Sequence, residues 1–435
     1  MRASSQGASK SRQVVAAVIG NALEWYDFIV YGFLSSIIAR LFFPSGDEYT
    51  SMLMTLATFG VGFFMRPVGG ILLGLYADSR GRKAAMQLII RLMTIAIALI
   101  AFAPDYAAIG VAAPLLIVVA RMLQGFATGG EYASATAFLV ESAPPDRRGL
   151  YGAWQLFGQC LAVFAGAGMG ALVTHWLSPE ALDSWGWRVP FVLGLLIGPV
   201  GLWMRRHLQE TDEFQSAHSI PNVPRQPLLN VIKQHWRGVL VSMGMTIFGT
   251  ASFYVILVHM PTFANTVLGL PLYEVFLIQM AAVLMMTLII PIAGALSDRM
   301  GRRAVLFAAT FVFFIIVYPL FAWLTAAPNL ERLLVMQLVL CANLGVCFGP
   351  APTALAEQFP THVRSTGISV GYNVAVMLFG GFGPFIVTWL VRASGTPVAP
   401  AWYVLFATLL SLIATACLRE KEPPALVAQR PEIPT

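Results

Sequence analysis

Charged residues are scarce in this sequence. Only 11% of its 435 residues are Asp, Glu, Lys or Arg, whereas 57% are hydrophobic. A water-soluble domain usually carries about 25% charged residues. A chain of this composition cannot hide its apolar surface from water, so lipid must be the solvent for most of it. The composition therefore predicts an integral membrane protein.

Cysteine is also rare, and the sequence lacks the residue patterns of an enzyme. Cys160, Cys341, Cys347 and Cys417 lie in apolar segments without metal-ligand spacing, which is typical of small core residues. The chain has no nucleophile–base arrangement, no His/Cys/Asp metal set and no G-x-x-x-x-G-K-[ST] phosphate loop. The sequence predicts no enzyme, no cofactor and no metal site.

The basic residues form no single patch, so the formal charge of +6 does not indicate a nucleic-acid partner. They lie in short runs between apolar stretches, and a membrane-spanning helix needs about 20 mostly apolar residues. Twelve stretches qualify or come close: Val14–Ala39, Met52–Leu75, Ala84–Phe102, Ala112–Val140, Leu150–Thr174, Val189–Met204, Val239–Met260, Val275–Leu296, Ala304–Leu324, Leu333–Leu355, Gly367–Val391 and Trp402–Leu418.

The distribution of Lys and Arg predicts the orientation of these helices. With the N-terminus in the cytoplasm, the cytoplasmic segments hold 20 of the 27 basic residues and the outer segments hold four. Cytoplasmic loops of membrane proteins carry such an excess, so we expect both termini in the cytoplasm. Because lipid tolerates no open sheet edge, we predict an all-α fold with twelve transmembrane helices.

Two loop patterns occur twice, at nearly the same distance along the chain. Gly74-x-x-x-Asp78-x-x-Gly81-Arg82-Lys83 returns 220 residues later as Gly294-x-x-x-Asp298-x-x-Gly301-Arg302-Arg303. Glu141-x-x-Pro144-x-x-x-Arg148 returns 216 residues later as Glu357-x-x-Pro360-x-x-x-Arg364. The repeats predict two six-helix halves in parallel orientation, residues 1–204 and 238–435, joined by a polar cytoplasmic linker over residues 205–237.

These loops, the duplication and Arg121-x-x-Gln124-Gly125 resemble the major facilitator superfamily. Three further motifs are similar to its metabolite–proton symporters: Gly20-Asn21-Ala-Leu-Glu24-Trp25-Tyr26-Asp27-Phe28, Arg66-Pro67-Val-Gly69-Gly70 and Gly129-Gly130-Glu131. Four others are similar to its citrate and tricarballylate branch: Trp185-Gly186-Trp187-Arg188-Val-Pro190-Phe191, Glu210-Thr211-x-Glu213-Phe214, Pro261-Thr262-Phe263 and Trp323-Leu-Thr-Ala-Ala-Pro328. Arg91 departs from the family pattern, which has a small polar or apolar residue there.

The resemblance implies a monomeric, multi-pass transporter of the bacterial cytoplasmic (inner) membrane. It implies proton-coupled import of a tri- or dicarboxylate, such as citrate or tricarballylate, by alternating access. Proton symport of another small metabolite is the alternative: a dicarboxylate, an aromatic acid or a compatible solute. The fifth stretch lacks the glycine-proline motif of proton antiporters, which favours symport over drug efflux.

Ionisable residues inside the spans are functional candidates, because each costs about 2.5–3.5 kcal/mol to insert. Six lie in the first half, namely Glu24, Asp27, Arg66, Arg91, Arg121 and Glu131, and the second half has only His259. We predict that Arg121, beside Gln124, holds a substrate carboxylate, because a guanidinium can bind one bidentately. The alternative is that Arg121 is the structural partner of an acid in the first helix.

Asp27, Glu24 and Glu131 are the predicted proton-coupling residues. In one hypothesis, ionised Asp27 holds Arg121, and protonation frees the guanidinium for substrate. In the alternative, Glu24 and Asp27 form a structural pair with Arg66. The remaining substrate-binding candidates are neutral: Asn21, Tyr26, Gln155, Gln159, Tyr254 and Asn343. Gln155 and Gln159 could equally join helices.

The duplicated loops supply the gating candidates. They are Asp78, Arg82, Asp298, Arg302, Glu141, Arg148, Glu357 and Arg364. We expect ion pairs that hold the outward-open state and break as the halves rock. Solvated loop charges are the alternative.

Overall fold

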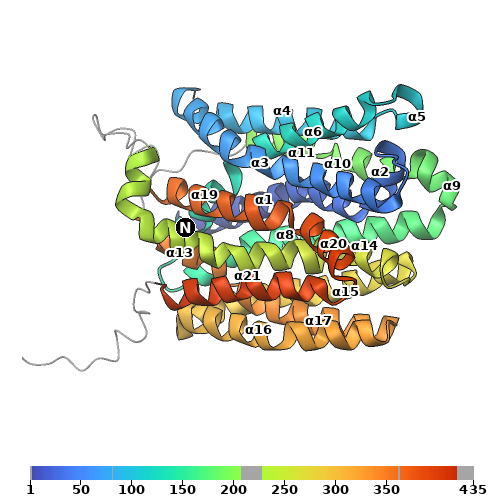
Figure 1. Ribbon diagram of the computed structural model, residues 1–435. Helices are drawn as coiled ribbons and strands as arrows, with labels where there is room; N and C mark the ends of the chain where they lie inside the picture. The colour runs from blue at the N-terminus through green and yellow to red at the C-terminus, as the bar shows by residue number, and fades with distance from the viewer. Residues whose placement is uncertain (1, 81, 207–227, 361–362, 419–435) are drawn as a thin grey trace, which may run out of the picture.

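The computed structural model describes residues 2–80, 82–206, 228–360 and 363–418, and every regular element in this part is a helix (Figure 1). The all-α prediction is confirmed. The elements up to residue 206 are α1 (Arg2–Phe33), α2 (Ser35–Phe42), α3 (Glu48–Arg80), α4 (Arg82–Ala101), α5 (Tyr106–Ile109), α6 (Ala112–Thr128), α7 (Glu131–Glu141), α8 (Arg148–Trp176), α9 (Pro179–Ala181), η1 (Leu182–Gly186), α10 (Arg188–Gly194) and α11 (Ile197–Arg206).

The second series of elements begins at residue 228, so the predicted linker over residues 205–237 lies largely outside the described residues. The elements are α13 (Leu228–Ser252), η2 (Phe253–His259), α14 (Met260–Thr266), α15 (Leu272–Met300), α16 (Arg302–Ala326), α17 (Leu330–Phe348), α18 (Ala351–Glu357), α19 (Arg364–Ala375), η4 (Val376–Gly381), α20 (Gly383–Ser394) and α21 (Ala399–Ala416).

Nine helices in the described part are long and apolar enough to cross a membrane. A tenth is added if Val18–Phe33 and Ser35–Phe42, which meet at 65°, form one bent span. The predicted third stretch contains a shorter apolar helix over Gln87–Ala101. The predicted sixth stretch is broken between α10 and α11. Pro199 gives the physical reason, because its ring clashes with the carbonyl of residue 195 and removes a helical hydrogen bond.

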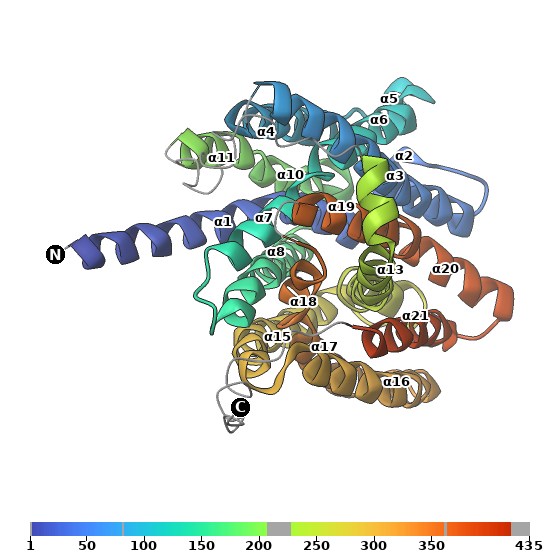
Figure 2. The same cartoon turned by 90° about the vertical axis from the view of Figure 1, so that its left-hand side faces the viewer.

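The described helices before residue 207 are called the first helix group here, and those after residue 227 the second helix group. In the view along the bundle, the helices before residue 207 fill mainly the upper part and those after residue 227 mainly the lower part (Figure 2). The groups meet where α8 packs on α15 and where α3 packs on η4 and α20. Gly149 and Gly294 allow the first of these contacts, because a Cβ on Gly294 would lie 2.6 Å from the Gly149 carbonyl oxygen.

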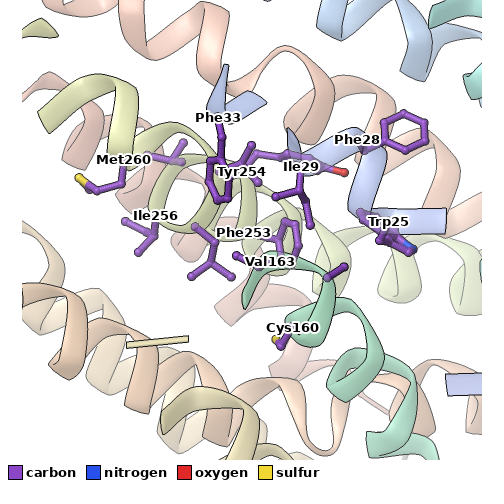
Figure 3. Close-up of a cluster of buried hydrophobic side chains, with 14 of the residues drawn as sticks. Trp25, Phe28, Ile29, Phe33, Cys160, Val163, Phe253, Tyr254, Ile256 and Met260 are labelled. Carbon is purple, nitrogen blue, oxygen red and sulfur yellow. The ribbon is translucent and has the colours of Figure 1, made fainter. Parts of the chain in front are cut away.

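Buried apolar side chains fill the middle of the bundle between the two groups. Trp25, Phe28, Ile29 and Phe33 of α1 and Cys160 and Val163 of α8 face Phe253, Tyr254 and Ile256 of η2 and Met260 of α14 (Figure 3). The prediction of buried cysteines holds for Cys160, Cys341 and Cys347. It is wrong for Cys417, which is exposed where the chain leaves α21.

Candidate functional site

Glycines set the crossing of α3 and α6, the two helices that carry the buried arginines. A Cβ on Gly125 would collide with the carbonyl oxygen of Gly62, and one on Gly129 with that of Arg66. Small residues of this kind let helix backbones approach closely in membranes. The close crossing places Arg66 of α3 and Arg121 of α6 in the middle of the bundle.

Asp27, Gln124 and Arg121 form one completely buried polar cluster. Arg121 Nη1 donates a 2.7 Å hydrogen bond to Gln124 Oε1, and Gln124 Nε2 donates to Asp27 Oδ2. The same Arg121 nitrogen lies 4.0 Å from Asp27 Oδ2. Gln124 thus bridges the acid and the base, which is the arrangement expected if Arg121 is the partner of an acid in α1.

Aromatic rings enclose this cluster. The Arg121 guanidinium lies 3.7 Å from the centroid of Tyr31 and 5.3 Å from that of Phe59. Within the described residues, Arg121 Nε and Nη2 and Asp27 Oδ1 have no hydrogen-bond partner. Asp27 and Arg121 each depend on the other, because removing one would leave the other charge buried and uncompensated.

Arg66 occupies a neighbouring aromatic environment, which shares Phe28 with Arg121. Its guanidinium lies 4.2 Å from the ring centroid of Phe63, 5.1 Å from Phe28 and 5.2 Å from Trp25. Tyr254 and Tyr372, which come from the second helix group, lie beside the same guanidinium. The sequence did not connect Arg66 with these tyrosines, because no motif links a cation in α3 to residues 188 and 306 positions further along the chain.

A cavity of about 70 Å³ lies next to Arg66 between the two helix groups. Its wall is mostly aromatic and aliphatic, with polar contributions that include Gln159, Thr250, Tyr254 and Tyr372. None of the described lining residues carries a charge. Two predicted substrate-binding residues, Gln159 and Tyr254, therefore line the cavity.

The other predicted substrate-binding residues lie elsewhere. Arg121 and Gln124 belong to the cluster with Asp27 and are not part of the wall. Asn21 Nδ2 donates a 2.8 Å hydrogen bond to the Gln155 carbonyl oxygen, so these residues join α1 to α8. Tyr26 is buried on α1, and Asn343 is partly buried on α17. These four also do not line the cavity.

The remaining ionisable residues of the spans are dispersed. Glu24 is buried on α1, and Glu131 is partly buried where α7 begins. Arg91 is exposed on α4. His259 Nε2 lies 3.2 Å from Thr388 Oγ1. These positions do not bring Glu131, Arg91 or His259 into the Asp27–Gln124–Arg121 cluster.

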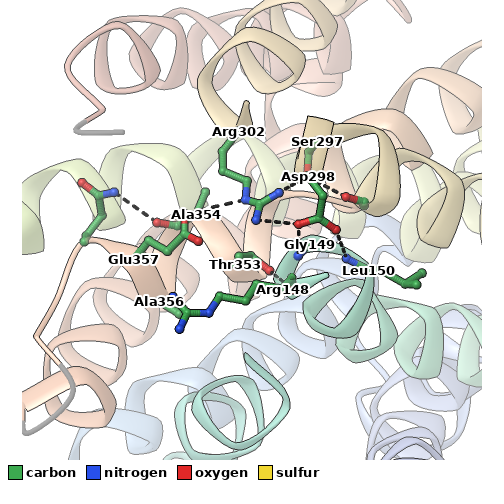
Figure 4. A network of polar contacts seen from close by, with 12 residues as sticks. Arg148, Gly149, Leu150, Ser297, Asp298, Arg302, Thr353, Ala354, Ala356 and Glu357 are labelled. Carbon is green, nitrogen blue, oxygen red and sulfur yellow. Dashed lines mark hydrogen bonds and ion pairs between the residues drawn. The ribbon is translucent and has the colours of Figure 1, made fainter. Parts of the chain in front are cut away.

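Six of the eight gating candidates have described side chains, and they meet at one end of the bundle, where α8 begins and α18 ends. We call this contact the basic gate: Glu141, Arg148, Gly149, Leu150, Asp298, Arg302, Glu357 and Arg364. Asp298 accepts hydrogen bonds from the backbone N–H groups of Gly149, at 2.8 Å, and Leu150, at 3.1 Å (Figure 4). An acid at a helix N-terminus satisfies free N–H groups and complements the helix dipole. Asp298 therefore fastens the second helix group to the first.

Ion pairs surround that cap. Arg302 Nη2 lies 2.7 Å from Asp298 Oδ1, and Arg302 Nε lies 3.6 Å from Glu357 Oε2. Arg364 Nη1 lies 2.6 Å from Glu141 Oε1, so this pair also joins the two groups. The carbonyl oxygen of Arg148 accepts a 2.9 Å hydrogen bond from Thr353. The side chains of Asp78 and Arg82 lie outside the described residues.

On the other side of the cavity, apolar contacts close the bundle. We call this contact the far gate: Gly32, Ser35, Gly60 and Phe63 facing Val258, Thr262, Gly381 and Phe382. A Cβ on Gly60 would lie 2.6 Å from the Phe382 ring, and one on Gly32 would collide with Val258. The Ser35 and Thr262 hydroxyls are 3.1 Å apart. The first and second helix groups are therefore also in contact here.

Comparison with similar proteins identifies the class to which this chain belongs. The Major Facilitator Superfamily model matches residues 17–370 and 274–434. The chain therefore belongs to the major facilitator superfamily, a family of multi-pass membrane transporters, and it is not an enzyme. Within that superfamily it groups with the metabolite–proton symporters, as the sequence motifs predicted.

Three relatives and one solved structure illustrate the match. The citrate-proton symporter of Salmonella typhi is 38% identical, over 93% of this chain and 93% of the relative. That of Klebsiella pneumoniae is 36% identical, over 98% and 95%. The proline/betaine transporter of Salmonella typhimurium (strain LT2) is 33% identical, over 94% and 83%. A crystal structure of a D-xylose-proton symporter shares the fold at a TM-score of 0.74 and 16% identity, over 93% and 96%.

Proposed function

We propose that this protein imports a small carboxylate together with protons across the bacterial cytoplasmic (inner) membrane. Citrate and tricarballylate are the first substrates to test, because the two citrate-proton symporters cover nearly the whole chain. The second candidate is proton symport of another metabolite, such as a dicarboxylate, an aromatic acid or a compatible solute. The similarity to a proline/betaine transporter supports that candidate.

The proposed architecture is a monomer with twelve spans and both termini in the cytoplasm. Residues 1–204 and 238–435 form the six-helix halves, and residues 205–237 form the linker. In alternating access such halves rock about a substrate site near the middle of the membrane. The contacts at the basic gate and the far gate would then open in turn, and the cavity between them would receive the substrate.

The buried Asp27–Gln124–Arg121 cluster is the observation that carries the proposal of proton coupling. Ionised Asp27 compensates the charge of Arg121 through Gln124. Proton binding to Asp27 removes that compensation and leaves Arg121 as an uncompensated cation, so the protein gains affinity for an anion. The difference in substrate affinity between the two protonation states sets the strength of coupling. Glu24 and Glu131 are the next proton carriers to test.

The membrane potential adds a condition on stoichiometry. An inside-negative potential opposes anion entry by about 2.3 kcal/mol per charge per 100 mV. Import therefore requires at least as many protons as the substrate has negative charges, or a metal-bound substrate of lower charge.

Uptake into proteoliposomes tests the proposal. A labelled panel of citrate, tricarballylate, dicarboxylates, aromatic acids and betaine is offered while the pH gradient and the membrane potential are imposed separately. We expect accumulation of a carboxylate in response to the pH gradient. Accumulation of betaine alone would favour the second candidate, and no response to either gradient would contradict symport.

The first prediction concerns Asp27 and Arg121. Asp27→Asn imitates the protonated acid, so it should bind substrate with little dependence on pH and should not accumulate it against a gradient. Arg121→Gln should abolish accumulation, because it removes the buried cation whose charge Asp27 compensates, and Arg121→Lys, which keeps a positive charge but lacks the planar guanidinium that bonds Gln124, should restore it only in part. Binding across the acidic to mildly alkaline range and gradient-driven uptake are measured on each variant. Gradient-driven accumulation by Asp27→Asn would remove Asp27 as the proton carrier.

A further inference from the structure

We propose that the transported carboxylate is received at Arg66 rather than at Arg121. In this site Tyr254, Tyr372 and Gln159 donate hydrogen bonds to the carboxylate, and the Arg66 guanidinium behind them balances its charge. This inference rests on the proposed import of a carboxylate. It separates binding, at Arg66, from proton coupling, at the Asp27–Gln124–Arg121 cluster.

The cavity wall contains hydrogen-bond donors without partners among the described residues. Gln159 is 2% exposed and lines the cavity, and its amide nitrogen has no hydrogen-bond partner among the described residues. The Thr250 hydroxyl lines the same cavity and has none either in the described part. A buried donor without a partner costs free energy, so a ligand with acceptor oxygens is favoured here.

The same wall adjoins the Arg66 guanidinium. Trp25, Tyr254 and Tyr372 all line the cavity. Trp25 lies under the guanidinium at 5.2 Å, the two tyrosines lie beside it, and Tyr372 also contacts Gln159. A ligand that contacts the two tyrosines and Gln159 is therefore separated from the Arg66 guanidinium only by these side chains.

Arg121 is placed for a different task. It does not line the cavity and is completely buried, with Tyr31 stacked on its guanidinium and Gln124 bonded to it. Phe28 lies between the two arginines, 5.1 Å from Arg66 and 5.2 Å from Arg121. A carboxylate in the cavity meets Arg66 and its tyrosines before it can reach Arg121.

The charge of the wall supports one anionic contact at this place. Because none of the described lining residues is charged, the cation closest to the cavity wall dominates the potential that a ligand meets. Arg66 can stabilise a carboxylate that donors orient, and the described wall offers no second cation, so further carboxylates of the substrate are stabilised less well there. The rest of the substrate would contact residues such as Phe253 and Met245.

The test compares a carboxylate substrate with an analogue that carries one negative charge fewer. Citrate is the probe, together with the analogue in which one carboxylate is a carboxamide; if the wild type takes up a different carboxylate from the panel, that acid and its amide are used. Binding to purified protein in detergent is measured for the wild type, Arg66→Gln, Arg66→Lys and Tyr372→Phe. Arg91→Gln is the matched control, because Arg91 is an exposed arginine far from the cavity wall.

We expect Arg66→Gln to weaken acid binding about 100-fold and to remove the preference for acid over amide, because the charge that distinguishes the two ligands is lost. Arg66→Lys keeps the charge and should retain part of the preference. Tyr372→Phe should weaken acid binding about tenfold. Arg91→Gln should retain the preference.

The preference for acid over amide separates a binding role of Arg66 from a structural one. If Arg66 had only a structural role, Arg66→Gln would weaken the binding of acid and amide equally. If Arg66→Gln fails to fold, it binds neither ligand, and the preference for acid over amide is then measured on Arg66→Lys and Tyr372→Phe. An unchanged preference in folded Arg66→Gln overturns the inference. If the wild type takes up no carboxylate at all, the proposed function itself fails and this inference fails with it.

Discussion

The two gates join the helix groups with different chemistry. At the basic gate, Asp298 caps the start of α8 and Arg364 pairs with Glu141, so charge and hydrogen-bond geometry hold the groups together. At the far gate, glycines receive the side chains of Val258, Phe382 and Phe63. Ionic contacts respond to charge and salt, whereas close packing responds to volume. Each gate should therefore be broken by a different kind of substitution.

The far gate also depends on local backbone geometry. Val258 belongs to the π-helical segment η2, and Gly381 ends the π-helical segment η4. Such segments are uncommon and occur frequently at functional sites. The basic gate uses the ends of ordinary α-helices and the duplicated loops. At the far gate, packing can therefore change through the geometry of the π-helical segments. At the basic gate, it is the contacts at the helix ends that change.

The largest effect is expected from volume at the far gate. Gly60→Trp places a ring where a single Cβ would already lie 2.6 Å from Phe382, so the gate cannot close. Uptake should be lost, while substrate still binds from the open side. Gly46→Trp is the matched control, because a Cβ there meets nothing within 4 Å. Normal uptake by Gly60→Trp would show that the far gate does not need to close.

Removal of charge at the basic gate should have a smaller effect. Asp298→Asn keeps an acceptor for the Gly149 N–H but loses the charge pair with Arg302. We expect turnover to fall about tenfold with substrate affinity unchanged, because breaking a largely buried pair leaves an uncompensated charge. Turnover and equilibrium binding are compared with those of Asp146→Asn, an exposed acid. Lost binding with intact turnover would contradict a gating role. If the repeated loop motif has the same function in both copies, Asp78→Asn should reduce turnover as Asp298→Asn does.

A weaker effect is expected from the second ion pair. Arg364→Gln removes the pair with Glu141, whose side chain is 29% exposed, and solvent screens such contacts. Turnover should fall about threefold, and the difference from the wild type should shrink as salt concentration rises. Uptake rates at low and high salt give the measurement. A deficit that grows with salt would exclude an electrostatic contribution.

The smallest effect is expected from Ser35→Ala. The Ser35–Thr262 contact is one neutral hydrogen bond in an otherwise apolar gate, worth about 1 kcal/mol. Uptake should stay within about twofold of the wild type. Gly60→Trp and Ser35→Ala, compared in the same assay, show whether packing rather than hydrogen bonding holds the far gate. A loss of uptake in Ser35→Ala as large as that in Gly60→Trp would reverse this ranking.

Several features of the site are recognisable in the sequence. Buried ions stand out because lipid makes them costly, so the sequence alone indicates Asp27, Arg66 and Arg121 as candidates. The repeated loops pointed to Asp298, Arg302, Glu357 and Arg364, and the structure brings these side chains together with Glu141 and the start of α8. Gln159 and Tyr254 were chosen as neutral binding candidates and line the cavity.

The sequence by itself determined that this chain is an all-helical membrane protein of the major facilitator superfamily, because the composition and the repeated motifs are local properties. Only the tertiary structure decided which charges meet. Glu24 and Asp27 lie on one face of α1, yet Asp27 is bridged to Arg121 by Gln124. The physical reason is that helix rotation and crossing depend on contacts between distant segments, such as Gly125 against Gly62. The same contacts place Arg66 beside Tyr254 and Tyr372, which no periodicity or spacing connects.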